Sequence, residues 1–326
     1  MTEPRLRGAA LATVVLLLAG CAAPAPAKRY PLWSYVRTPI SPFWWTTVVD
    51  VPGARAKGAM GAGTSIAILG TGVLTPHEDL PTVVPGVATC GPPSNTQDDN
   101  GHGTQLAGIA AGRDPGTLTR GVAPAATLIP IKTDCVVVTA PALMNGMDAA
   151  IARKPDVILI AIGGYPSSPG LFKFLLDRVD GNPDILFVVA SAWDGVHYMF
   201  PDWTLRKNAL LVAAMTLDAD ERDETRVRHD KEIPYTARRG TIWAPGRGIG
   251  TVSIETYPGP PAPYEMHGTS PAAAIVAGCA ALVKSKSKPG TGGAALKEAL
   301  VKAAQPKPDL GPPPDNGRLD CARATP

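Results

Sequence analysis

Charge is scarce in this chain of 326 residues, and neither sign predominates. Charged residues make up 18% of the sequence, and the formal net charge is only +3. Nucleic-acid partners select for a concentrated basic excess, so this composition gives no argument for such a partner. Hydrophobic residues, at 45%, suffice for a large core, and the 34 glycines and 35 prolines fit a loop-rich α/β fold better than a helical bundle.

The N-terminal hydrophobic run is too short to span a membrane. It covers residues 9–19, whereas a spanning helix needs roughly 20 apolar residues. Behind Arg5 and Arg7, a run of this length is typical of an export signal. Residues 18–21 (Leu-Ala-Gly-Cys) resemble the lipobox of bacterial lipoproteins, which implies cleavage before Cys21 and acylation of that cysteine. An ordinary signal peptide with an incidental cysteine is the alternative.

The sequence predicts three consecutive segments. Residues 1–20 form a lipoprotein signal peptide, residues 21–60 a Pro/Ala-rich tether followed by an N-terminal arm, and residues 61–326 one folded domain. Acylated Cys21 would hold the exported domain to a membrane. Because Ala22 rather than an aspartate follows the cysteine, the outer membrane is expected in a cell with two membranes.

Four further cysteines follow the anchor position: Cys90, Cys135, Cys279 and Cys321. An even number in an exported chain favours two disulfides, for which three connectivities exist. Free buried cysteines are the alternative.

Apolar segments alternate with helical ones along the domain. Strands are expected at residues 65–69, 82–89, 127–133, 157–162, 185–191 and 210–214, and helices at residues 102–111, 140–153, 171–179, 269–284 and 294–304. Continuous apolar strands between helices indicate an α/β fold with a parallel sheet covered on both faces.

Two glycine-framed turns that lead into predicted helices carry reactive side chains. Residues 268–270 (Gly-Thr-Ser) precede a helix of small residues, and residues 101–104 (Gly-His-Gly-Thr) begin another. At a helix N-terminus, unpaired N–H groups and the helix dipole favour developing negative charge. Ser270 is therefore a candidate nucleophile and His102 the base that would take its proton. A Thr-Ser-Pro sequence can also serve simply as a helix cap.

Together the two turns resemble the serine and histidine segments of the subtilisin-like serine proteases. Further matches follow in the family's order at residues 65–73, 77–80, 121–126, 161–164, 244–246 and 317–320, so that the resemblance spans about residues 60–324. It implies a subtilisin-like three-layer sandwich, with residues 61–326 as the peptidase domain and the site at the carboxyl ends of the strands. It also implies that an extended peptide pairs with Ala161, Ile162, Gly163 and Gly164.

The chain departs from this family at two positions where chemistry is done. Gly70 stands where the triad aspartate would orient the imidazole of His102 and stabilise its charge. Trp193 stands where an asparagine amide would donate to the oxyanion, which leaves the backbone N–H of Ser270 as a donor. In such proteases the loss of the acid costs roughly 10⁴-fold in turnover and the loss of one oxyanion donor about 10²–10³-fold.

No neighbouring acid is expected to replace the missing one. Asp98 and Asp99 precede the helix and are expected to face solvent, and Glu78 and Asp79 follow the first strand. Asp79 matches a residue of ordinary family members, so it is not a new acid. A water molecule beside Gly70 would orient the imidazole poorly.

The family's sheet order also bears on the cysteines. The strands that end near Cys90 and Cys135 are neighbours in that order, and parallel neighbours bring their carboxyl ends together. The resemblance therefore implies a Cys90–Cys135 disulfide, with Cys279 and Cys321 as a second candidate pair.

The sequence thus favours an exported, lipid-anchored member of the family whose proteolysis is impaired or absent. A non-catalytic module that binds a peptide or protein partner at the cell envelope is the alternative, because fold alone does not fix function. The expected partners are a protein or peptide and a membrane. No cofactor is expected, and a structural calcium ion is left open.

Overall fold

The computed structural model describes residues 43–113, 121–162, 168–191, 201–217, 230–232, 240–254, 264–306 and 317–326. Within these ranges a 10-stranded sheet has the order β11-β12-β8-β6-β5-β4-β1-β3-β2, with β7 beside β6. Its parallel strands are β1 (Ser65–Gly70), β2 (Val87–Ala88), β3 (Thr127–Lys132), β4 (Val157–Ile160), β5 (Leu186–Ala190), β6 (Ala209–Leu217), β8 (Ile242–Pro245) and β12 (Gly317–Arg318).

Short antiparallel strands complete the description. β7 (Asp230–Glu232) pairs with β6, and β11 (Gln305–Pro306) pairs with β12. β9 (Ile249–Thr251) and β10 (Tyr264–Met266) form a separate two-stranded sheet.

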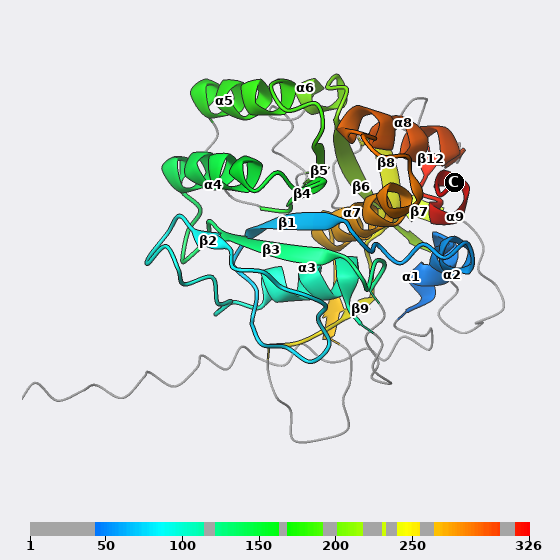
Figure 1. Ribbon diagram of the computed structural model, residues 1–326, viewed down its shortest axis with the longest axis horizontal. Coiled ribbons are helices and arrows are strands. Elements are labelled where there is room, and N and C mark those ends of the chain that lie inside the picture. The colour runs from blue at the N-terminus through cyan, green and yellow to red at the C-terminus, as the bar shows by residue number, and fades with distance from the viewer. Residues whose placement is uncertain are drawn as a thin grey trace, which may run out of the picture. The chain divides into compact units, whose positions relative to one another are not determined.

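Helices cover both faces of the large sheet, as the sequence predicts. Figure 1 shows α3 (His102–Ala111) and α4 (Ala140–Ala152) on opposite sides of β1 and β3. α7 (Thr269–Lys286) shares the core of α3, and α5 (Pro169–Asp180) shares that of α4. Along β1, Ile66 and Ile68 pack into the first core and Ala67 into the second, which is the two-residue period of a strand buried on both sides. The expected three-layer α/β sandwich is confirmed.

Part of the predicted N-terminal arm belongs to the folded domain. It forms α1 (Trp44–Val48) and α2 (Val51–Ala56), and Trp45 is fully buried in the core. The backbone N–H of Cys321 donates to the carbonyl of Val49 over 2.8 Å. The arm therefore packs against the C-terminal end of the domain, where α8 (Gly293–Ala303) and α9 (Cys321–Ala324) lie.

The expected strand over residues 82–89 is much shorter in the structure. Only β2 forms a ladder with β3, and Val83 makes a single bridge to Leu128. Between them, Pro85 has no N–H to donate, and Gly86 lies so close to Pro130 that a Cβ there would be 1.8 Å from its carbonyl oxygen. The proline and the close approach interrupt the ladder.

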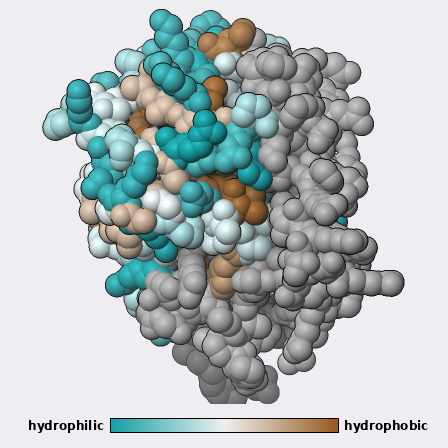
Figure 2. All heavy atoms as spheres, turned by 90° about the vertical axis from the view of Figure 1, so that its right-hand side faces the viewer, coloured by the Kyte–Doolittle hydropathy of each residue, from teal (hydrophilic) through white to brown (hydrophobic). Residues whose placement is uncertain are grey.

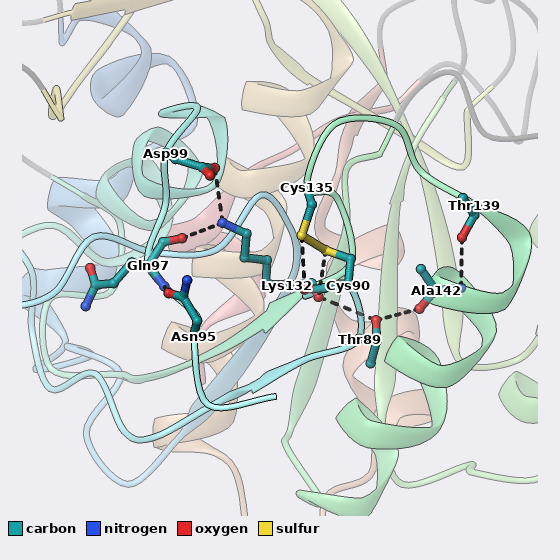
Figure 3. Close-up of a disulfide and its surroundings, with 9 residues drawn as sticks. All are labelled: Thr89, Cys90, Asn95, Gln97, Asp99, Lys132, Cys135, Thr139 and Ala142. Atoms are coloured by element: carbon teal, nitrogen blue, oxygen red, sulfur yellow. Dashed lines mark hydrogen bonds and ion pairs between the residues drawn. A yellow bond between two sulfur atoms is a disulfide. The ribbon is translucent and has the colours of Figure 1, made fainter. Parts of the chain in front are cut away.

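Two disulfides join distant parts of the chain. Cys90 follows β2 and Cys135 follows β3, and their Cα atoms are 5.9 Å apart in the first disulfide (Figure 3). The second joins Cys279 of α7 to Cys321 of α9, with 5.5 Å between the Cα atoms. The strand order β3-β2 explains the first pairing, because it brings the ends of both strands to one edge.

The surface over the C-terminal side of the molecule is mixed in character. Figure 2 shows hydrophilic and hydrophobic side chains interspersed over the described part of this face. Among the described residues, no helix, α6 (Pro201–Thr204) included, combines the length and the hydropathy needed to cross a bilayer.

Candidate active site at the carboxyl edge of the sheet

His102 is the first residue of α3, and the turn before it is fixed by one carboxylate. Asp98 is only 5% exposed, which corrects the expectation that it faces solvent. Its oxygens satisfy donors that the helix start leaves without partners. They accept hydrogen bonds of 2.6–3.0 Å from the backbone N–H groups of Asn100, Gly101 and Thr104 and from the Thr104 hydroxyl.

The glycines around His102 are required by the backbone. Gly101 has a φ of 102°, in the left-handed region that favours glycine. A Cβ on Gly103 would lie 2.0 Å from the carbonyl oxygen of Gly72, so a larger residue would push α3 away from the sheet. The N–H of Gly103 instead donates to the Thr71 hydroxyl over 2.9 Å. Since Thr71 directly follows β1, this hydrogen bond joins the N-terminus of α3 to the carboxyl end of that strand.

The turn before Ser270 is fastened to the sheet in a similar way. The hydroxyl of Thr269 donates to the carbonyl of Ser191, which directly follows β5, over 2.6 Å. The N–H of Gly268 donates to the carbonyl of Gly246, which follows β8, over 2.7 Å. Gly268 is the N-cap and Ser270 the second residue of α7, so Ser270 does not act as the cap.

The sheet brings the two helix N-termini to one edge. β1 and β5 are separated only by β4, which is about 10 Å at the usual strand spacing. The helices also touch: a Cβ on Gly278 of α7 would lie 2.5 Å from the carbonyl oxygen of Ala110 of α3. These contact points are each eight residues beyond Ser270 and His102, and both helices start at the carboxyl ends of strands of the same sheet.

Gly70 ends β1 at the same edge. A Cβ at this position would meet no atom within 4 Å, so there is open space at the position where the sequence predicts that a triad aspartate is missing. The carbonyl of Gly70 accepts two hydrogen bonds from the chain that follows β3, from the N–H groups of Thr133 (2.9 Å) and Asp134 (3.2 Å).

The electrostatics of the site involve Asp134, an acid that stands in no recognised motif. Burial lowers the pKa of His102, and the negative charges of Asp98 and Asp134 oppose this shift. Burial raises the pKa of Asp134, and His102 opposes that shift in turn. A sequence signal existed, because Asp134 is the first acid after β3, and β3 pairs with β1.

Asp99 and Lys132 form an ion pair beside this acid. The side chain of Lys132 is 4% exposed and that of Asp99 is 70% exposed, with 3.0 Å between Nζ and the carboxylate. The Lys132 ammonium also donates to the carbonyl of Gln97 over 2.6 Å (Figure 3). Asp99 therefore faces solvent, as expected. Its negative charge raises the pKa of Asp134 and Lys132 lowers it, both acting less strongly than burial.

The remaining predicted site residues are only partly described. Ala161 is buried and Ile162 half-buried, directly after β4. The other four lie outside the described residues: Gly163, Gly164, Trp193, which is expected at the oxyanion position, and Cys21, which is expected to be acylated.

Comparisons with known proteins place this arrangement in context. The subtilase family of peptidases matches residues 61–319. Subtilisin DY of Bacillus licheniformis is 30% identical over 237 residues, which cover 71% of this chain and 80% of that protein. Subtilisin Savinase of Lederbergia lenta is 30% identical over 247 residues, which cover 75% and 84%.

Solved structures show the same fold. The structure of MycP1 without its N-terminal propeptide has a TM-score of 0.65 and 21% identity, and covers 86% of this chain and 96% of its own. The MycP3 protease of the type VII (ESX-3) secretion system has a TM-score of 0.66 and 24% identity, with 87% and 88% covered.

Proposed function

The chain belongs to the subtilase family of serine-type peptidases, and on this premise we propose that it is an exported, membrane-anchored endopeptidase of low turnover. Ser270 is the nucleophile and His102 the general base. One observation carries the proposal. The N-terminus of α7, with Ser270, is hydrogen-bonded to the carboxyl end of β5, and the N-terminus of α3, with His102, is hydrogen-bonded to that of β1. Only β4 lies between these two strands.

The reaction follows from these positions. The hydroxyl oxygen of Ser270 bonds to the carbonyl carbon of the scissile peptide, while His102 takes the hydroxyl proton. The C–N bond then breaks as His102 gives that proton to the leaving amine. Water, deprotonated by His102, releases the acyl group as a carboxylic acid and regenerates Ser270. As the second residue of α7, Ser270 has a backbone N–H without a partner inside the helix, which can donate to the oxyanion.

Low turnover follows from what is missing at position 70. Without a carboxylate on β1, His102 lacks the usual partner that fixes its tautomer and stabilises its positive charge. Its lowered pKa keeps the imidazole neutral and able to accept a proton at neutral pH. Replacement of the oxyanion amide by Trp193 weakens the second stabilising element.

Substrates are extended segments of proteins or peptides. Ala161 and Ile162 continue β4 at the site edge, so together with Gly163 and Gly164 they offer backbone groups for pairing with an added strand. Unstructured segments meet this requirement without unfolding. The membrane anchor at Cys21 restricts cleavage to proteins of the cell envelope.

Labelling of Ser270 by a fluorophosphonate probe tests the proposed chemistry. We expect slow covalent labelling, mapped to Ser270 by peptide mass spectrometry, and slow cleavage of an unstructured protein that is lost in Ser270→Ala. Heat-denatured protein is the control for nonspecific labelling. If the folded protein neither labels nor cleaves but binds unstructured peptides, the non-catalytic binding module is the better account.

The anchor is tested separately by mass spectrometry of the mature N-terminus. We expect a diacylated Cys21 as the first residue, because residues 18–21 follow an apolar run of signal-peptide length. Cys21→Ser should remain unacylated and should leave the membrane fraction. Detection of an intact Met1, or of an unmodified Cys21, contradicts this assignment.

A further inference from the structure

We propose that Asp134 is a positioning residue for His102, which supplies from the end of β3 the carboxylate that Gly70 cannot supply from the end of β1. The inference rests on the proposed peptidase function of Ser270 and His102. It adds an acid that stands in none of the family's motifs.

The backbone places Asp134 next to the position of the missing carboxylate. Gly70 is in register with Lys132 across the parallel pair of β1 and β3. The next two N–H groups, of Thr133 and Asp134, both donate to the single carbonyl of Gly70. This shared acceptor bends the chain around the end of β1, so Asp134 lies beside the open space at Gly70.

Neighbouring contacts hold the bend in place. Cys135, the next residue, is joined to Cys90. The N–H of Thr89 donates to the carbonyl of Lys132 over 2.8 Å, and its hydroxyl donates to the carbonyl of Ala142 in α4 over 2.7 Å. Figure 3 shows these contacts gathered around the disulfide. A carboxylate on this segment is held on a rigid support, which is what a positioning group requires.

The two acids near His102 differ in what their carboxylates are free to do. Asp98 already accepts four hydrogen bonds at the start of α3. Asp134 is half-buried, and within the described ranges its carboxylate accepts no hydrogen bond. It therefore retains oxygens that can accept the imidazole N–H, a contact that in such sites often tightens only when substrate excludes water.

The charges around His102 and Asp134 predict a change in the pH dependence of kcat/KM that a purely structural role of Asp134 would not produce. His102 faces Asp98 and Asp134, and Asp134 faces His102, Asp99 and Lys132. Asp134→Asn removes one of the two negative charges that raise the pKa of His102, so that pKa should fall further below its ordinary value of 6.5. Because His102 acts as a base when neutral, the acid limb of kcat/KM should move to lower pH.

The experiment compares five full-length proteins on one unstructured substrate: the parent chain, Asp134→Asn, Asp177→Asn, Gly70→Asp, and Gly70→Asp with Asp134→Asn. Asp134→Asn should lower kcat at least about tenfold and at most by the roughly 10⁴-fold seen when a triad acid is lost, with KM little changed. Asp177→Asn makes the same charge change on an exposed side chain of α5 that acts on neither His102 nor Asp134, so it should alter neither kcat nor the acid limb. Gly70→Asp should restore turnover in the Asp134→Asn background.

The outcomes separate the inference from the function on which it rests. If the parent chain shows no cleavage and no labelling that depend on Ser270, the proposed peptidase function itself is wrong. Two results for Asp134→Asn would overturn the inference: a change in KM alone, or a loss of folding without a change in kcat per folded molecule. An equal gain in turnover from Gly70→Asp with and without Asp134 would also overturn it. An NMR titration gives the pKa of His102 without any need for turnover. It compares Ser270→Ala with Ser270→Ala plus Asp134→Asn, and an equal pKa of His102 in the two proteins overturns the pairing.

Discussion

Gly70→Asp combined with Trp193→Asn should raise turnover of an unstructured protein substrate by roughly 10²–10⁴-fold. The aspartate would enter open space, because a Cβ at position 70 meets nothing within 4 Å. There it would orient His102 and stabilise the imidazolium, and the asparagine amide would donate to the oxyanion. The gain should stay below the product of the two separate effects, since groups that act as one unit are not additive.

The measurement is kcat and kcat/KM for the parent, both single variants and the double variant, with Ser270→Ala as the blank. Thermal unfolding of each protein shows whether a change in rate reflects a change in the folded fraction. If the parent chain already matches the double variant, and Ser270→Ala abolishes that activity, position 70 does not limit catalysis. If neither the parent nor the folded double variant shows turnover that depends on Ser270, the binding module becomes the better account.

Removal of the two disulfides should cost similar stability but have different effects on turnover. They close loops of nearly equal length, with sequence separations of 45 for Cys90–Cys135 and 42 for Cys279–Cys321. Each paired Cys→Ala change should therefore lower the free energy of unfolding by about 2–4 kcal/mol. Only loss of Cys90–Cys135 should also lower kcat, because Asp134 precedes Cys135 and the bend around Gly70 would loosen.

This pair of variants is a matched comparison. Denaturant unfolding gives the stability cost, and kcat is measured at a temperature where all three proteins remain folded. Equal kcat values for the two disulfide variants would contradict a role of the first disulfide in holding Asp134.

The sequence predicts local features of this protein well and non-local ones less well. The helix over residues 102–111 was expected with the bounds that the structure gives it, since the glycine-framed turn and the apolar run are adjacent in sequence. The burial of Asp98 was missed, because it depends on the turn folding back over the carboxylate. β7, β9, β10, β11 and β12 were not expected, as they have only two or three residues each and pair with distant segments.

In the candidate site, too, the local motifs could be predicted from the sequence and the non-local contacts could not. Ser270 and His102 stand in recognisable motifs, so they could be proposed from sequence, as could the absence of an acid at Gly70. Asp134 could not be found by motif, because the family's pattern places the acid on β1. Its place as the first acid after β3 is a weak signal, and the structure adds that two N–H groups after β3 share the carbonyl of Gly70.

The contact between the arm and α9 bears on the order in which the chain can fold. Cys321 donates to the carbonyl of Val49, and the ammonium of Lys57 donates to the carbonyls of Ala322 and Thr325 over 2.9 and 2.7 Å. The arm is synthesised early, but its partners emerge from the ribosome some 265 residues later. A nascent chain therefore cannot complete this domain until residues 321–325 have left the ribosome, and the arm remains without these partners for most of the chain's synthesis.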